Sequence, residues 1–100
     1  MTFVILTTKP GQYHTEPGEG LQPVERYDYS LSGRTRAQFV IARLEGSPRV
    51  KVVDDTPPGV VNYVPCKFLP RFESIESARR ELQQLAGAGG SQFKLTAVAL

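Results

Sequence analysis

The chain has 100 residues, 40% of them apolar, and its 12 Lys and Arg against 10 Asp and Glu give a net charge of +2. The length fits one domain with a modest core over residues 1–100. The charge excess is too small for binding nucleic acid by electrostatics alone.

Cys66 is the only cysteine, which excludes an internal disulfide framework. The N-terminal apolar run is too short for a signal peptide, and no segment reaches the roughly 20 apolar residues of a membrane span. We therefore expect a cytoplasmic protein that does not enter a membrane.

The first part of the chain predicts one buried strand followed by a long irregular segment. Phe3–Leu6 is a short, continuous apolar run, typical of an interior strand that is contacted on both faces. Lys9–Pro23 then contains three Gly and three Pro. Because Pro removes a backbone donor and Gly weakens regular structure, we expect no strand or helix to run through this segment.

The middle of the chain alternates apolar and polar residues with the period of β-strands. Val24–Ser32 and the run from Ala37 to Ile41 flank a turn that contains Gly33, which predicts a β-hairpin. Arg49–Val53 is the next alternating run, and two Asp and two Pro end it. Residues 24–54 are therefore expected to form a three-stranded antiparallel meander. A further short strand is expected over Val60–Val64, before the edge or loop segment 66–69.

The last third predicts one helix and one strand. Ser74 is a suitable N-cap for a helix that extends to Leu85. An apolar stripe recurs at helical spacing at Ile75, Ala78, Leu82 and Leu85, and Gly87, Gly89 and Gly90 are expected to end the helix. The run from Phe93 to Leu100 carries apolar residues on both faces, so a strand paired inside the sheet is expected.

Together these elements predict an α+β domain. We expect a mainly antiparallel sheet of five or six strands, arranged as a meander or half-barrel, with one helix packed on one face.

No residue pattern marks a catalytic, metal or cofactor site. His14 lacks an evident orienting partner, which a general base requires. A thiol nucleophile at Cys66, with His14 as base and Asp54 or Asp55 as orienter, has no support in spacing, and we expect Cys66 to be a structural thiol. The pair Asp54–Asp55 supplies only part of a divalent cation site. We therefore expect no catalytic residue, no metal site and no cofactor.

The two segments rich in Pro and Gly are the best candidates for a binding surface. Thr56–Phe72 has four prolines and several large apolar residues outside any strand pattern, and Lys9–Pro23 is a long loop. If they meet at one end of the sheet, they combine apolar, polar and cationic groups, as interfaces do. The chain is thus predicted to be a small, non-enzymatic binding or accessory module whose partner is another protein. The predicted binding residues are Tyr13, His14, Tyr63, Lys67, Phe68 and Arg71.

Two alternatives remain open at this stage. The first is a protein that binds a small ligand, or a small enzyme, with a pocket between helix and sheet that uses His14. The second, weaker alternative is binding of single-stranded nucleic acid, because basic residues lie near aromatic residues. The basic residues concerned are Arg34, Arg36, Arg49, Lys51, Lys67 and Arg71.

Overall fold

A computed structural model describes residues 1–88, 90 and 92–100. Its elements are β1 (Thr2–Thr8), β2 (Tyr13–Glu16), β3 (Leu21–Leu31), β4 (Arg34–Leu44), β5 (Arg49–Asp54), β6 (Val61–Pro65), the 3-10 helix η1 (Cys66–Phe68), β7 (Arg71–Phe72), α1 (Ile75–Ala88) and β8 (Phe93–Val98). The strands form a five-stranded sheet in the order β7-β1-β4-β3-β8 and a three-stranded sheet in the order β2-β5-β6. Every pair of neighbouring strands is antiparallel. The predicted α+β class is confirmed.

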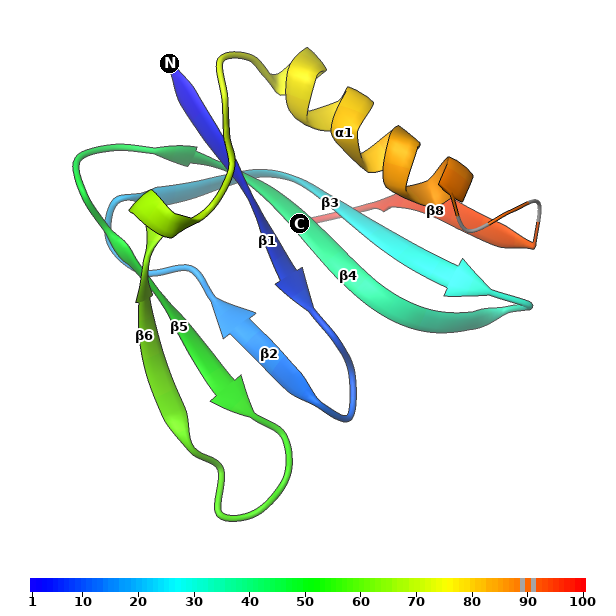
Figure 1. The fold of residues 1–100 in the computed structure, drawn as a ribbon, viewed down its shortest axis with the longest axis horizontal. Helices are drawn as coiled ribbons and strands as arrows, with labels where there is room; N and C mark the ends of the chain where they lie inside the picture. The colour runs from blue at the N-terminus through cyan, green and yellow to red at the C-terminus, as the bar shows by residue number, and fades with distance from the viewer. Residues whose placement is uncertain (89, 91) are drawn as a thin grey trace.

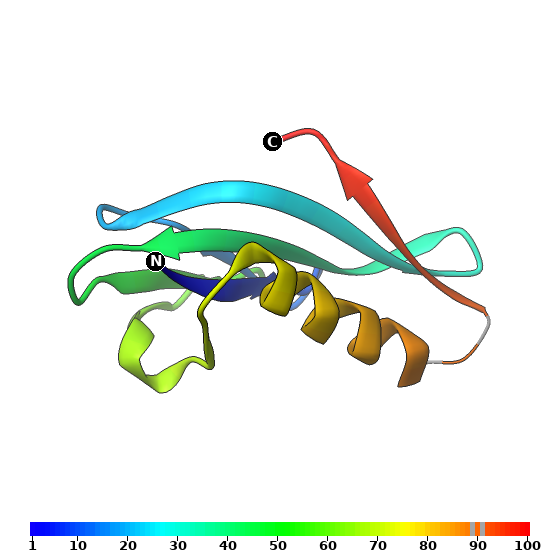
Figure 2. The same cartoon turned by 90° about the horizontal axis from the view of Figure 1, so that it is seen from above.

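The five-stranded sheet lies between α1 and the three-stranded sheet (Figure 1). Figure 2 shows α1 running along one face of it. On the helix side, Phe3, Phe39 and Ile41 pack with Leu82 of α1, whereas Val4 and residues near it pack with the three-stranded sheet. Because successive residues of a strand point to opposite faces, β1 contributes to both cores. This explains the continuous apolar run Phe3–Leu6 and confirms the interior strand predicted from it.

The hairpin between β3 and β4 follows from its turn sequence. Leu31 pairs with Arg34, so Ser32 and Gly33 are the only residues of the loop. Both have positive φ angles, +50° and +80°, which is the geometry of the two-residue turn that matches the twist of the flanking strands. The predicted hairpin is therefore confirmed.

The predicted meander over residues 24–54 is wrong in its third strand. β4 pairs with β3 along one edge and with β1 along the other, so no edge of β4 is left for β5. Instead, β5 pairs with β2 and β6 in the second sheet. The pairing of β1 with β4 joins residues far apart in sequence, and no local pattern shows it.

The prediction that Lys9–Pro23 is an irregular segment, with no strand or helix running through it, is also wrong. β2 lies inside this segment, and β3 begins at Leu21. Pro23 is tolerated within β3 because the ladder with β4 shifts between Pro23 and Glu25, and because β8 pairs with β3 only from Arg26 onward. At Pro23 the edge of β3 that faces β8 is therefore unpaired. A residue without a backbone N–H costs the sheet little stability there.

The helix begins as predicted and ends later. The Ser74 hydroxyl accepts a hydrogen bond from the Ser77 N–H at 3.0 Å, which confirms the N-cap. The helix continues through Gly87 to Ala88, and the expected stop at Gly89 lies outside the described residues. Leu82 is buried, but Leu85 is 46% exposed because it borders a surface hollow described below rather than the core.

An ion pair fixes α1 over β3. The Arg79 guanidinium donates to both carboxylate oxygens of Glu25, with Nε 2.8 Å from Oε1. The Tyr27 hydroxyl donates to the same Oε1 at 2.7 Å. These bonds, the one from Arg79 first, hold the pKa of Glu25 below its usual value. The bidentate geometry sets the position of the helix above the strand.

The strand β8 lies at the edge of the five-stranded sheet, so the prediction that it is paired inside the sheet is wrong. Phe93 and Leu95 are partly buried, and the Phe93 ring stacks on Tyr29 with centroids 4.8 Å apart. Apolar residues on both faces of a strand therefore did not require two neighbouring strands here.

Candidate functional site

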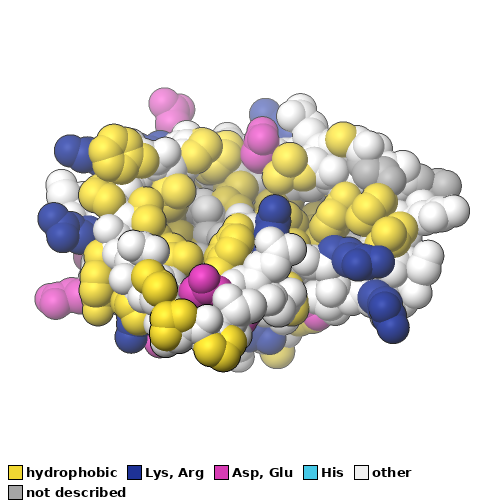
Figure 3. Space-filling view, turned by 60° about the horizontal axis from the view of Figure 1, so that its bottom comes forward, with side chains coloured by type: hydrophobic (Ala, Val, Ile, Leu, Met, Phe, Trp, Pro, Cys, Tyr) yellow, Lys and Arg dark blue, Asp and Glu magenta, His cyan; other side chains and the backbone are white. Residues whose placement is uncertain are grey.

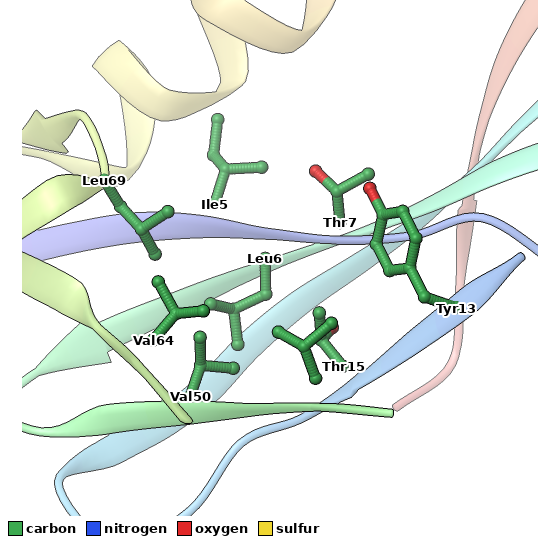
Figure 4. Close-up of a pocket in the computed structure, with 9 residues that line it drawn as sticks. Ile5, Leu6, Thr7, Tyr13, Thr15, Val50, Val64 and Leu69 are labelled. Carbon is green, nitrogen blue, oxygen red and sulfur yellow. The ribbon is translucent and has the colours of Figure 1, made fainter. Parts of the chain in front are cut away.

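An apolar hollow that opens to the surface lies between β1 and the inner face of the three-stranded sheet (Figure 4). Its volume is about 320 Å³, and aliphatic side chains make most of its wall. Figure 4 shows Leu69 at one end and Tyr13 at the other, with Leu6 and Val50 between them. The lining residues are Ile5, Leu6, Thr7, Tyr13, Thr15, Val50, Val52, Val64 and Leu69.

The hollow forms because β1 and β2 start as a hairpin and then separate. The backbones of Lys9 and Tyr13 exchange two hydrogen bonds of 3.0 Å each. Beyond this pair the strands diverge, and the Thr15 N–H donates to the Thr8 hydroxyl at 2.9 Å instead of to a backbone carbonyl. At the other end of β1, β7 pairs only with Phe3 and Val4. Among the described residues, no strand pairs with β1 between Ile5 and Thr8 along the edge opposite β4. A gap therefore remains between β1 and the three-stranded sheet.

A second, smaller hollow continues the first one toward the helix. It has a volume of about 220 Å³ and shares Ile5, Thr7 and Leu69 with the larger hollow. Its other lining residues are Phe39, Pro70, Phe72, Glu81 and Leu85. We call the two hollows together the β1 groove. Figure 3 shows apolar side chains gathered around a hollow on the half of the molecule that holds β5 and β6.

The six predicted binding residues do not form one patch. Tyr13 lines the β1 groove, whereas His14 points to the opposite face of β2, because the two residues are consecutive in a strand. The Tyr63 side chain lies on the same outer face as that of His14, since Tyr63 pairs with Lys51 and Lys51 with Glu16, two residues from His14.

The other three predicted residues follow β6. Lys67 and Phe68 belong to η1, directly before the groove residue Leu69, and Arg71 lies in β7. Phe68 is 71% exposed, and the Lys67 Nζ atom lies 5.3 Å from the centre of its ring. Both predicted segments contribute to the lining of the groove, the first with Tyr13 at one end and the second with Leu69 at the other.

The outer face of the three-stranded sheet carries an ionic cluster around His14. Its Nδ1 donates to Asp55 Oδ1 at 2.7 Å, and its Nε2 lies 3.3 Å from Glu16 Oε2. Lys51 Nζ is 3.8 Å from the same Glu16 oxygen. The hydrogen bond to Asp55 is the main reason that the pKa of His14 is raised above 6.5. His14 thus has a partner after all, a carboxylate 41 positions away in sequence.

This cluster predicts a pH dependence of stability. Folding raises the pKa of His14 above 6.5, its value in the unfolded chain. The ionic cluster therefore contributes fully to the free energy of unfolding below pH 6.5. This contribution is lost as the pH rises through the pKa of His14 in the folded state. We expect the free energy of unfolding of the wild type to fall across this range, and that of His14→Gln to fall less. Urea titrations at a series of pH values measure both. Parallel profiles for the two proteins would show that the cluster contributes nothing.

The structure separates the residues of the hypothetical thiol site. Cys66 is buried in the core between the sheets, and burial raises the pKa of its thiol, with the Arg71 charge acting in the opposite direction. His14 instead lies on the outer face. Asp54 accepts hydrogen bonds from the Thr56 N–H and hydroxyl, which lower its pKa. Asp54 therefore binds Thr56, whereas Asp55 binds His14.

The basic residues of the nucleic-acid alternative lie on separate elements. Arg34 belongs to the start of β4, Arg49 and Lys51 to β5, and Arg71 to β7. Phe39, an aromatic on β4, is buried in the core and is not available for stacking on a base.

Sequence reasoning missed most of the groove. Ile5, Val50, Val52 and Val64 read as core residues, because an aliphatic side chain on a strand has the same pattern whether it packs against another layer or lines a hollow. Leu69 was included only within the wider segment Thr56–Phe72. No local signal in the sequence distinguishes these residues.

Within residues 1–88, 90 and 92–100, no group of three or more His, Cys, Asp or Glu side chains has an arrangement that could hold a metal ion. In the same part of the chain, no helix has the length and apolar composition needed to cross a membrane. Comparison with known proteins gives no match to any family model, curated protein or solved structure.

Proposed function

We propose that this chain is a small, non-enzymatic binding module whose partner is another protein, and that an apolar segment of that partner occupies the β1 groove. The observation that carries the proposal is the groove itself, an open apolar hollow of about 320 Å³ that continues into a second one. Sites of this size that are lined mainly by apolar groups, with a few polar ones, are typical of ligand recognition.

The surroundings of the groove favour a protein over a small molecule. Phe68, next to the groove residue Leu69, is 71% exposed, and Leu85 at the helix end is 46% exposed. Exposed apolar area that continues beyond a hollow favours a partner larger than the hollow. Lys67 and Arg71 lie two positions before and after the groove residue Leu69 in the chain, and cationic side chains are usual at the rim of an interface.

Binding without catalysis is part of the proposal. The titratable side chains that line the groove are Tyr13, in the larger hollow, and Glu81, in the smaller one. His14, which the enzyme alternative would use, lines neither hollow. We also propose that the module acts in the cytoplasm, which its single, buried free thiol supports.

The test measures partner affinity and stability together. The wild-type chain captures a partner from a lysate of its host, and calorimetry with the purified partner then gives Kd for the variants Phe68→Ala and Tyr13→Ala. We expect Phe68→Ala to weaken binding about tenfold or more, as the loss of an aromatic anchor does. Its thermal midpoint should stay close to that of the wild type, because Phe68 is mostly exposed.

Leu100→Ala is the matched control, since Leu100 is 67% exposed and lies beyond β8, outside the groove. If Phe68→Ala, Tyr13→Ala and Leu100→Ala all bind as the wild type does, the groove is not the binding site.

A second candidate function is binding of a small apolar ligand within the larger hollow. The hydroxyl-bearing residues Thr7, Tyr13 and Thr15 line this hollow together and could orient such a ligand. Native mass spectrometry of the chain purified from its host tests this candidate. A complex of the chain with a small molecule that is lost in Tyr13→Ala supports this candidate. Detection of the chain alone, without a bound molecule, contradicts it.

A further inference from the structure

The strand β6 is an open edge of the three-stranded sheet. It is the last strand in the order β2-β5-β6 (Figure 1), and Val61 and Tyr63 on it are 42% and 60% exposed. Residues 60–65 read Val-Val-Asn-Tyr-Val-Pro, without a charged side chain. Proteins usually protect a sheet edge with charges, bulges or a covering segment, because its free backbone groups can pair with another strand. Along β6, only Pro65 at the end gives such protection.

The hydrogen bonds at the two ends of β6 show which backbone groups are free. The Val60 carbonyl accepts from the Asp54 N–H at 2.9 Å, and the Cys66 N–H donates to the Pro48 carbonyl at 3.0 Å. Both bonds point toward the β5 side. Because backbone groups of successive residues in a strand point to opposite edges, residues 62 and 64 also face β5. The N–H and C=O groups of Val61 and Tyr63 therefore point outward.

We propose that two copies of this chain associate through β6, edge to edge and antiparallel, about a twofold axis at Asn62. In this register Val61 of each copy lies opposite Tyr63 of the other, and all the outward N–H and C=O groups of these two residues are paired. The two three-stranded sheets then become one continuous sheet. A twofold interface requires such a self-complementary surface.

The side chains agree with this arrangement. Val61 and Tyr63 lie on the same outer face of β6, because they are two residues apart in a strand. In the dimer each Tyr63 ring packs against Val61 of the second copy, and such aromatic to β-branched pairs stabilise antiparallel strands. The only side chain on the twofold axis is that of Asn62, which is neutral. The inference is independent of the β1 groove, which Tyr63 does not line.

A disulfide scan tests both the association and its register. Asn62 of one copy lies directly opposite Asn62 of the other, in a pair without backbone hydrogen bonds, where Cα atoms are about 4.5 Å apart. This distance permits a disulfide. We expect purified Asn62→Cys to form a covalent dimer under mild oxidation, because Asn62 is exposed and its replacement leaves the fold intact.

The control is Val60→Cys, which places a thiol at another exposed position, 51% exposed, directly before β6. In the proposed register the two copies of residue 60 are offset by four residues, about 13 Å along the strands, and cannot be bridged. The wild type, whose only thiol is the buried Cys66, gives the background. A dimer that forms equally with both variants, or with neither, overturns the proposal.

Sedimentation equilibrium tests the association without a crosslink. We expect the wild type to show a dimer fraction that rises with concentration, and Tyr63→Lys to reduce it at least tenfold by placing a charge on the edge. Thr96→Lys, on the exposed face of the edge strand β8, should leave the dimer fraction unchanged. A wild-type chain that stays monomeric up to about 1 mM would also overturn the proposal.

Discussion

Leu82→Ala is expected to lower the free energy of unfolding by about 2–5 kcal/mol, as truncations of buried Leu do. Leu82 is 1% exposed and packs with Phe3, Phe39 and Ile41 beneath α1. The truncation leaves a cavity between the helix and the five-stranded sheet, in the apolar cluster that also holds Ala78 of α1. Since small domains have about 5–15 kcal/mol of stability in total, the variant should unfold at much lower denaturant concentration.

Leu85→Ala is the matched control for this prediction. It removes the same atoms from the same apolar stripe, one turn along, but Leu85 is 46% exposed. We expect its cost to stay below about 1 kcal/mol, because much of the side chain already contacts water. Urea titrations of both variants measure the difference. Equal costs would mean that α1 does not pack on the sheet through Leu82.

Gly20→Ala is expected to have the second largest effect, about 2–4 kcal/mol, through combined backbone strain and steric overlap. Gly20 has a φ of +88°, and an added Cβ would lie 2.9 Å from both the Glu45 carbonyl oxygen and the Pro48 Cβ. The contact cannot open freely, because the Glu45 N–H donates to the Gly20 carbonyl at 2.9 Å. The turn before β3 and the turn after β4 are thus packed against each other at this point.

Gly46→Ala separates the two causes. Gly46 also has a positive φ, +73°, but an added Cβ would meet no atom within 4 Å. We expect this control to lose only the strain, about 1–2 kcal/mol. Thermal and urea unfolding of both variants give the comparison. If Gly20→Ala costs no more than Gly46→Ala, the close approach of the two turns is not important for stability.

The candidate site shows how far residue types alone can lead. Tyr13 and Phe68 were expected in a binding surface, and one lines the β1 groove while the other lies beside it. His14 was expected with them, yet it lies on the opposite face of β2 in an ion cluster with Asp55. Consecutive residues of a strand point to opposite faces, so Tyr13 and His14 are separated. Because the sequence did not predict β2, it could not show that these two side chains lie on different faces.

The elements that the sequence determined by itself are those whose signals are local. The Ser74 cap, the hairpin turn that contains Gly33, and the apolar run of β1 each depend on a few adjacent residues. Their physical causes act within one turn or one strand: an unpaired N–H to cap, a positive φ, and burial on two faces.

Apart from the β3–β4 hairpin, the tertiary structure alone decided which strands are neighbours. β4 pairs with β1, so β5 joins β2 and β6 in a second sheet, and β8 becomes an edge. Any two amphipathic strands can form the same backbone hydrogen bonds, so the choice between partners depends on which edges the rest of the chain leaves vacant. The β1 groove and the open edge of β6 are consequences of that choice, because each is a strand edge, or part of one, that no other segment of the described chain covers.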